Sequence, residues 1–242
     1  MNDLVASIPF LGKRNPALAR WVVILVILAA PVVAGLFGRT WVRILDFALL
    51  YMLLALGLNL VVGFAGLLDL GYIAFYAVGA YTWAFLASPH FEVHWPFWAI
   101  LPLGAGFAAL AGIILGFPVL RLRGDYLAIV TIGIGITLQL IALNTAWLTG
   151  GSRGITDIPR PLPGLIDSVA GRNLLLLGLL LVIVIVLYAA LQALVRSPWG
   201  RVLKAIREDE TAAESLGKNA FALRLQSFVI GSAVMGLGGA LG

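Results

Sequence analysis

The residues best suited to chemistry are charged side chains concentrated in one segment of an otherwise apolar chain, Arg196–Arg224. This charged segment holds six basic and four acidic residues. A charged side chain at the centre of a bilayer costs roughly 2.5–3.5 kcal/mol, so the run Arg207–Glu210 alone would cost on the order of 10 kcal/mol there. Apolar runs flank the segment on both sides. It is therefore predicted to be a water-exposed loop between two spans, either a solvated connector or a docking element for a soluble partner.

The charged segment carries the signals of a short amphipathic helix. Ser197 is a predicted N-cap, and Pro198 suits the first helical position, where its missing N–H is not needed. Glu214 and Lys218 stand four residues apart in the favourable order, and Gly217 suits a left-handed C-terminal cap. Four apolar side chains recur at helical spacing and predict one apolar face: Val202, Ile206, Ala213 and Leu216.

Other reactive groupings are sparse. The chain has no cysteine, which excludes disulfides, thiolate metal sites and cysteine nucleophiles. His90 and His94 stand four apart around Glu92, but Pro89 and Pro96 leave little room for a helix to align them, so a plain external loop is expected. An intramembrane enzyme would need a nucleophile or metal cluster that the sequence does not supply. The G-x-x-x-x-G-K-[ST] phosphate-binding loop is also absent, so energy from ATP would have to come from another subunit.

Composition fixes the class of protein. The 242 residues are 62% hydrophobic and 11% charged, against roughly 25% charged residues in soluble domains. The net charge of +5 does not indicate nucleic-acid binding, because the basic residues lie in loops beside apolar runs. We predict an all-α polytopic transmembrane bundle of about seven spans, forming a single transmembrane domain over residues 1–242. The predicted spans are 21–37, two within 44–87, 95–118, 126–148, 174–195 and one that begins near 222.

The stretch Ile44–Ala87 must contain a break. As one helix it would be about 66 Å long, twice the thickness of a hydrocarbon core of about 30 Å. The Gly63–Gly66 sequence is the natural place for a turn. Two crossings or a broken helix are therefore expected.

The positions of the basic residues predict the orientation. With the N-terminus in the cytoplasm, loops on that side carry eleven Lys and Arg residues, and outside loops carry five. This bias follows the positive-inside rule and predicts a multi-pass protein with a cytoplasmic N-terminus. The chain stops at Gly242 inside an apolar run, which predicts that at least one further span follows.

Polar residues within the spans are candidates for a translocation path, because intramembrane polar groups usually face a cavity or another helix. Asp69 lies beside the predicted break, where unwound backbone can line a substrate route; the alternative is an interfacial aspartate beside a turn. Gly133 and Gly135 permit close helix approach, so packing alone also explains them. The candidate path residues are Asn59, Gly63, Gly66, Asp69, Gly71, Tyr72, Thr131, Gly133, Gly135, Thr137 and Gln139, with Asn144 as a further polar candidate.

The loop 149–172 combines turn-forming glycines with stiffening prolines. It is either a passive linker or a docking surface for an external protein. The candidate docking residues are Thr149, Gly150, Gly151 and Gly154.

Four stretches resemble the permease subunits of ABC importers for branched-chain amino acids, in the order typical of that family. They are GFAGLLDLGYIAFYAVGAY (63–81), GFPVLRLRGDYLAIVTIGIG (116–135), LTGGSRGI (148–155) and SPWGRVLKAIREDETAAESLG (197–217). The first two are similar to the M-type rather than the H-type partner of the permease pair.

The resemblance implies a bacterial inner-membrane subunit with no enzymatic activity or cofactor of its own. Its implied partners are two ABC ATPase subunits that use ATP and Mg, a second, related permease, a periplasmic solute-binding protein and the lipid bilayer, but no nucleic acid. It also implies that residues 196–222 form a cytosolic coupling loop held in a groove of the ATPase. On this interpretation the groove contacts are Val202, Ile206, Ala213 and Leu216, and the charge-pairing and register residues are Arg207, Glu208, Asp209 and Glu210, with Gly217 ending the helix.

Two alternatives stay open at this point. The family commonly has a glutamate and an arginine just after the G-x-G, where this chain has Ile136 and Gln139. An importer of the same family for urea or another small solute is therefore an alternative. An ion-coupled secondary transporter would need ionisable groups in mid-span, and only Asp46 and Asp69 are available, both near span ends.

Overall fold

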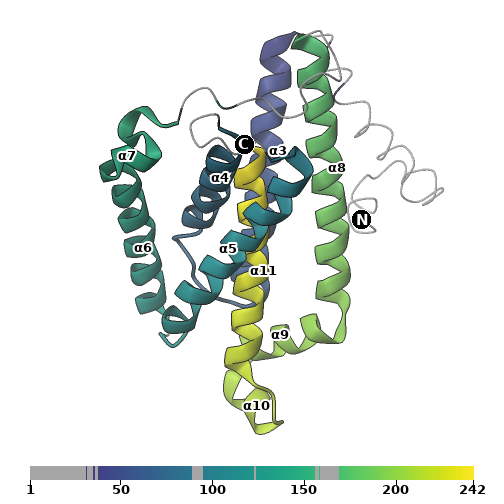
Figure 1. The fold of residues 1–242 in the computed structure, drawn as a ribbon. Coiled ribbons are helices and arrows are strands. Elements are labelled where there is room, and N and C mark those ends of the chain that lie inside the picture. Colours follow the sequence, from purple (N-terminus) through teal and green to yellow (C-terminus); the bar gives the residue numbers. More distant parts are fainter. Residues whose placement is uncertain are drawn as a thin grey trace, which may run out of the picture. The chain divides into compact units, whose positions relative to one another are not determined.

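The computed structural model describes residues 31, 35, 38–88, 95–122, 124–155, 158 and 169–242. All secondary structure within these ranges is helical (Figure 1). This agrees with the composition, because a helix satisfies its own backbone hydrogen bonds in lipid. Five of the described helices are long and apolar enough to cross a membrane, and one shorter apolar helix accompanies them. The predicted all-α polytopic fold is confirmed.

The predicted spans match observed helices wherever the structure describes them. The bounds are α3 Arg39–Leu58, the π-helix η1 Asn59–Phe64, α4 Ile73–Ala87, α5 Phe97–Val119, α6 Asp125–Asn144, α7 Ala146–Thr149, η3 Gly151–Arg153, α8 Val169–Arg196, α9 Pro198–Glu208, α10 Glu210–Ser215 and α11 Ala220–Leu241. The span predicted at 21–37 lies almost wholly outside the described residues, as do the His90–His94 loop and the prolines of the 149–172 loop.

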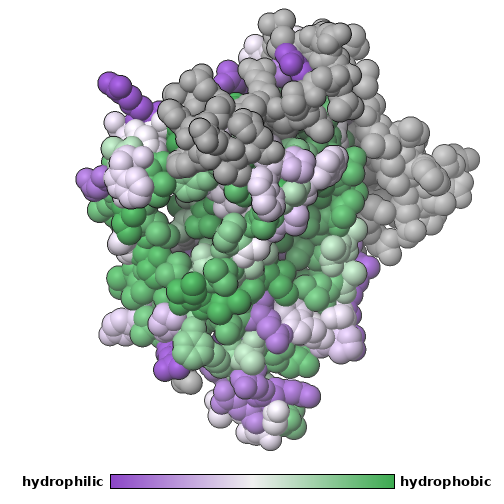
Figure 2. Space-filling view, viewed as in Figure 1, coloured by the Kyte–Doolittle hydropathy of each residue, from purple (hydrophilic) through white to green (hydrophobic). Residues whose placement is uncertain are grey.

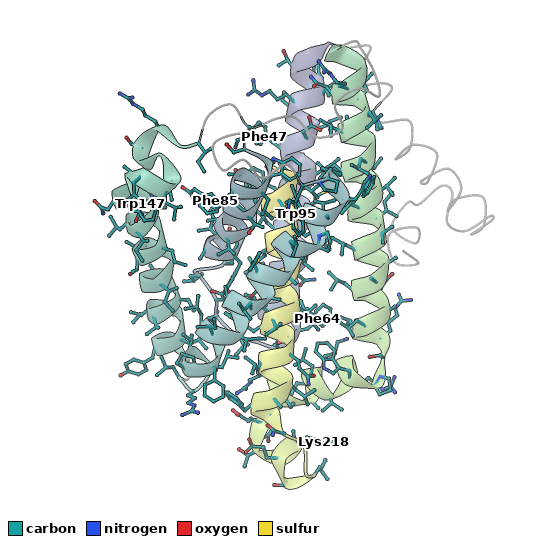
Figure 3. All side chains as sticks on the ribbon, viewed as in Figure 1. Phe47, Phe64, Phe85, Trp95, Trp147 and Lys218 are labelled. Atoms are coloured by element: carbon teal, nitrogen blue, oxygen red, sulfur yellow. The ribbon has the colours of Figure 1, made fainter. Side chains whose placement is uncertain are left out.

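The predicted break between residues 44 and 87 is confirmed. Helix α3 continues into η1, helical structure ends at a turn on Ala65, and α4 begins only at Ile73. Gly66 takes a φ of 72°, which favours glycine. We call residues 59–72, which comprise η1 and the non-helical stretch after it, the break. Phe47 and Phe85 lie toward one end of the helices and Phe64 toward the other, so the chain turns back here (Figure 3).

Contacts divide the chain into two compact units, residues 1–46 with 164–181 and residues 47–163 with 182–242. In the described part of the first unit, the buried side chains include Val42 near the start of α3 and Leu177 and Leu180 in the first half of α8. All of the candidate site residues belong to the second unit.

The second unit is organised around α11, which packs against α4 and α5 (Figure 1). Phe75 of α4 and Phe228 of α11 meet edge to face, with their ring centroids 5.4 Å apart. Ala108 of α5 and Met235 of α11 are completely buried in the same core. By contrast α6 buries only Leu127 and Thr131 and exposes most of its apolar side chains.

Small residues allow these helices to approach closely. A Cβ atom added at Gly79 of α4 would collide with the backbone carbonyl of Gly236 in α11. A Cβ atom at Gly236 would collide with Ala108 of α5. Close backbone contact through small residues is the usual basis of helix association in membranes.

We therefore expect Gly79→Ala to destabilise the protein by about 1–3 kcal/mol, because the added methyl group meets backbone that cannot rotate away. Thermal unfolding of the purified protein in detergent measures the change. Gly106→Ala on α5 is the matched control, since a Cβ atom there has open space. It should be neutral or slightly stabilising; equal melting temperatures for both variants would contradict the packing argument.

Hydrophilic residues collect at one end of the second unit. Figure 2 shows hydrophobic side chains over the flanks of the helices and hydrophilic ones around α10. Lys218 lies at this end, whereas Trp95 and Trp147 lie toward the other (Figure 3). The charged segment thus extends beyond the apolar helices, as predicted for a loop outside the bilayer.

Candidate functional site

The charged segment folds as two short helices rather than the single predicted one. Helix α9 ends at Glu208 and α10 begins at Glu210, with the junction at Asp209. The Asp209 side chain accepts a hydrogen bond from the backbone N–H of Ala212 at 3.0 Å, which makes it the N-cap of α10. Asp209 is therefore a local cap, and its predicted charge pairing with a partner stays a prediction.

The helical structure of the segment begins and ends where predicted, but the Ser197 side chain does not make the predicted capping hydrogen bond. Pro198 is the first residue of α9, but the Ser197 hydroxyl donates to the carbonyl of Leu194 and does not cap α9. Gly217 takes a φ of 74°, and the N–H of Lys218 bonds to the carbonyl of Ala213, which is the left-handed C-terminal cap that the sequence predicted. Because this cap precedes Lys218, the predicted helical pair of Glu214 with Lys218 does not form.

The apolar face of the segment packs mainly inside this chain. Ile206 and Ala213 form a small core with Ala220 and are only 1% and 5% exposed, and Val202 packs against it. Their burial within this chain gives no support to the predicted groove contact of Ile206 and Ala213 with a partner, which stays a prediction. Leu203, which the prediction missed, is fully buried as well; its position three residues before Ile206 was the available signal.

Leu216 behaves differently from the rest of that face. It follows the last turn of α10 and is 80% exposed. A leucine so exposed at the hydrophilic end of the molecule is available for contact with another protein. Its predicted role in partner contact stays a prediction.

Glu210 has a partner within this chain. Its carboxylate accepts a hydrogen bond from the Arg224 guanidinium at 2.8 Å, and both side chains are partly buried. The ion pair joins the start of α10 to the first turn of α11. Glu210 thus fixes the register of the segment on the bundle instead of being a free charge for a partner.

Helix α9 is fastened to the bundle at two places. The Trp199 indole N–H donates to the side-chain carbonyl of Gln226 on α11 at 2.8 Å. At the other end of α9, Lys204 lies over the ring of Phe64, 5.2 Å from its centroid. A cation over an aromatic face is attracted by the negative charge of that face.

Arg207 connects the charged segment to the break. Its guanidinium donates a hydrogen bond to the backbone carbonyl of Gly63, within η1. The Arg207 stem also lies against Gly66, where an added Cβ atom would collide with it. In a π-helix and the turn after it, carbonyls lack the regular i→i+4 partners, so an arginine is a suitable donor for them. Lys204 and Arg207, three residues apart on α9, thus hold the same short stretch of chain, at Phe64 and Gly63.

Asp69, inside the break, is buried rather than interfacial. The residue is 2% exposed, and its Oδ1 accepts a hydrogen bond from the N–H of Gly71 at 2.9 Å. Its Oδ2 is also buried and has no hydrogen-bond partner among the described residues. This burial is within the protein, and whether Asp69 lies in the membrane interior or at its interface stays a prediction.

The end of the break docks on α6. The N–H of Leu70 donates to the Thr131 hydroxyl at 3.1 Å, and that hydroxyl donates to the carbonyl of Ala128 at 2.9 Å. Gly71 approaches so closely that a Cβ atom there would meet the Thr131 carbonyl, and Gly135 lies next to it. The break therefore touches α9 near Gly63 and α6 near Thr131.

A small cavity lies beside Asp69 and Thr131. The space open to the centre of a water molecule is about 10 Å³, close to the volume needed for one water. Its other walls are mainly apolar and come from α4, α5, α6 and α11: Ala74, Phe75, Leu115, Val119, Ile134 and Phe228.

The structure gathers some of the predicted path residues and leaves others apart. Asp69, Gly71 and Thr131 line the cavity, and Gly63, Gly66 and Gly135 lie along the break and its contact with α6. The remaining candidates do not line the cavity: Asn59, Tyr72, Gly133, Thr137, Gln139 and Asn144. Thr137 bonds to the carbonyl of Gly133 on its own helix, and Gln139 is exposed on α6.

The predicted docking residues for a binding protein form a compact turn after α6. Thr149 is buried and its hydroxyl donates to the carbonyl of Thr145 at 2.9 Å. Gly150, Gly151 and Gly154 all have positive φ, as sharp turns require. Nothing in this geometry tests the docking role, which stays a prediction. Within the described ranges, no cluster of acidic or histidine side chains is suited to a metal ion.

Comparison with known proteins places the chain in a family. The family described as "Branched-chain amino acid transport system / permease component" matches residues 40–242. The chain is 42% identical over 226 residues to the high-affinity branched-chain amino acid transport system permease protein LivM of Escherichia coli (strain K12), covering 84% of this chain and 52% of LivM. The LivM protein of Salmonella typhimurium gives the same identity and coverage.

A more distant relative extends the match beyond bacteria. A probable branched-chain amino acid transport permease protein LivM from Methanocaldococcus jannaschii is 30% identical over 148 residues, covering 59% of this chain and 41% of that protein. No solved structure gives a significant match. The chain spans about half the length of the curated relatives it matches.

The long apolar helices, the break beside Asp69 and the match over residues 40–242 agree with one another. The chain is a multi-pass membrane protein that belongs to the branched-chain amino acid transport permease family, of the LivM type.

Proposed function

We propose that the chain is a permease subunit of an ATP-driven importer and forms part of the translocation path for branched-chain amino acids. Two relatives named as high-affinity branched-chain amino acid transport permeases, the LivM proteins, are 42% identical to this chain. Its partners would be two ATPase subunits, a second permease and a periplasmic solute-binding protein. The ATPases would bind ATP and Mg. The complex would lie in the inner membrane of a bacterium, and the N-terminus of this chain would be in the cytoplasm.

The observation that carries the proposal is the hydrogen bond from Arg207 to the Gly63 carbonyl. It connects the charged segment, outside the apolar helices, to the break, which contains the buried carboxylate of Asp69. Movement of α9 by an ATPase would therefore act directly on the break. Because the break also touches α6 at Thr131, the movement would reach the walls of the Asp69 cavity.

The exposed part of the charged segment is the proposed ATPase contact. Glu208, at the end of α9, and Leu216, just after α10, are exposed there. Gly217 then ends the helical structure before α11. Ile206 and Ala213 would support this surface from within, and Asp209 and Glu210 would fix α10 through its N-cap and its ion pair with Arg224. Asp69, Gly71 and Thr131 are the proposed path residues.

Purification of the full-length protein with its genetic neighbours tests the proposal. We expect two ATPases and a second permease to co-purify, and proteoliposomes of the complex to accumulate labelled leucine only with ATP and the solute-binding protein. Uptake by this subunit alone, without ATP, would support a secondary transporter instead. Accumulation of urea in preference to leucine would overturn the assignment of the solute.

A further inference from the structure

The buried oxygen of Asp69 is the least satisfied polar atom near the break. Asp69 is only 2% exposed. Its Oδ1 accepts a hydrogen bond from the Gly71 N–H, and its Oδ2 has no partner among the described residues. A buried carboxylate oxygen without a hydrogen bond is costly. Such an atom has the capacity to accept a hydrogen bond from a donor group bound at this position.

The neighbouring Thr131 hydroxyl has acceptor capacity left. It accepts one hydrogen bond, from the Leu70 N–H, and donates one, to the Ala128 carbonyl. A hydroxyl oxygen has two lone pairs, so a second donor can bind. Asp69 and Thr131 both line the cavity and together offer two acceptors to one small donor group.

The chemistry of the cavity restricts what that group can be. The Asp69 carboxylate disfavours an anionic group beside it, so the carboxylate of a bound amino acid would have to point away from Asp69. A bare metal ion would need several more oxygen ligands than the two that these side chains offer. An ammonium group carries three donors and no acceptor, and it is similar in size to the single water for which the cavity has room.

The remaining walls favour an aliphatic body attached to that ammonium group. They are formed largely by alanine, phenylalanine, leucine, valine and isoleucine side chains of four helices. Such walls bury apolar surface favourably but leave the polar groups of urea unpaired. A larger body would require Leu70 and Gly71 to move away from Thr131, which is the contact between the break and α6.

We propose that the Asp69 cavity is a solute site in its closed form, in which Asp69 Oδ2 and the Thr131 hydroxyl bind the ammonium group of an aliphatic amino acid during transport. This inference rests on the proposed function and specifies its substrate contact. The apolar wall then receives the aliphatic side chain, and separation of the break from α6 opens the site.

Ligand-induced shifts in melting temperature of the purified full-length complex test the site without any transport. The probes are 3-methylbutylamine, which has only the ammonium group and aliphatic body, and 4-methylpentanoate, which has the body and a carboxylate. The amine should raise the melting temperature in a saturable way, and the acid should not. No shift with the amine, or equal shifts with both probes, would overturn the proposal and leave the cavity as a site for water only.

Two variants identify the residue responsible. Asp69→Asn keeps an acceptor for the Gly71 N–H but removes the charge, and should raise the half-maximal amine concentration at least about tenfold, the effect of losing one charge-assisted hydrogen bond. Asp125→Asn, at the exposed start of α6, is the matched control and should respond like the unmodified protein. An unchanged response in Asp69→Asn would overturn the assignment, and if that variant does not fold, the comparison of amine with acid in the unmodified complex still decides.

Failure of this inference and failure of the proposed function give different results. If the complex imports leucine with ATP but the amine does not bind, the site is wrong and the function stands. If the amine binds through Asp69 but ATP drives no amino-acid uptake, the site stands and the importer assignment is wrong.

Discussion

Replacing Arg207 by glutamine is expected to lower ATP-driven leucine uptake about tenfold while ATP hydrolysis by the assembled complex continues. Arg207 is the side chain by which α9 reaches the Gly63 carbonyl. A hydrogen bond from a charged donor contributes about 1.5 kcal/mol or more, which corresponds to about tenfold in an equilibrium. Uptake and hydrolysis are measured on the same proteoliposomes, so that their ratio reports coupling.

Two further variants sharpen the Arg207 experiment. Arg207→Lys retains a charged donor on a long stem and should recover part of the lost uptake. Arg201→Gln removes another exposed arginine of α9, whose guanidinium donates to the carbonyl of Arg196 rather than to the break, and should leave the uptake-to-hydrolysis ratio closer to normal. A parallel fall of uptake and hydrolysis in Arg207→Gln would mean that Arg207 serves assembly, and normal uptake would contradict the proposed connection.

Replacing Leu216 by aspartate is expected to reduce co-purification of the ATPases more than tenfold. Leu216 is 80% exposed at the hydrophilic end of the second unit, so its apolar surface is free to be buried by a partner. Full burial of a leucine contributes about 1.5–3 kcal/mol, and a carboxylate at the same position would add the cost of desolvating a charge. Affinity purification through a tag on this subunit, with quantification of the ATPases, measures the loss.

Trp147→Asp supplies the control for Leu216. Trp147 on α7 is 84% exposed, but it lies toward the opposite end of the second unit from Lys218 (Figure 3). The proposed orientation puts it on the periplasmic side, where a new charge should leave ATPase binding unchanged. Equal losses in both variants would indicate a general folding defect, and no loss in Leu216→Asp would contradict the proposed contact surface.

The sequence predicted the features that depend on local pattern. Apolar runs longer than a bilayer core define α5, α6 and α8. The length of Ile44–Ala87 required a break, and glycines gave its position. Pro198 and Gly217 gave the two ends of the charged segment because each restricts or permits a particular backbone conformation. The assignment of residues 1–242 to one domain stays a prediction.

Interactions between distant residues were beyond the reach of such patterns. Arg207 is 144 residues from Gly63 and Glu210 is 14 from Arg224, and nothing in either residue type specifies its partner. Helical spacing alone could not separate buried Ile206 from exposed Leu216, because α10 ends at Ser215 and Leu216 lies beyond the helix. The burial of Asp69 also could not be predicted, because it depends on contacts with residues distant in the sequence, on α5, α6 and α11.

The sequence by itself determined that this chain is a helical membrane protein, which stretches are long apolar helices, and where a charged loop and a break interrupt the apolar runs. These follow from the cost of placing charges and unpaired backbone groups in lipid, which each stretch of sequence meets locally. Only the tertiary structure decided that the loop holds the break through Arg207 and that Asp69 faces a cavity with one oxygen unpaired. Burial and pairing depend on which helices meet, and packing across the whole bundle fixes that.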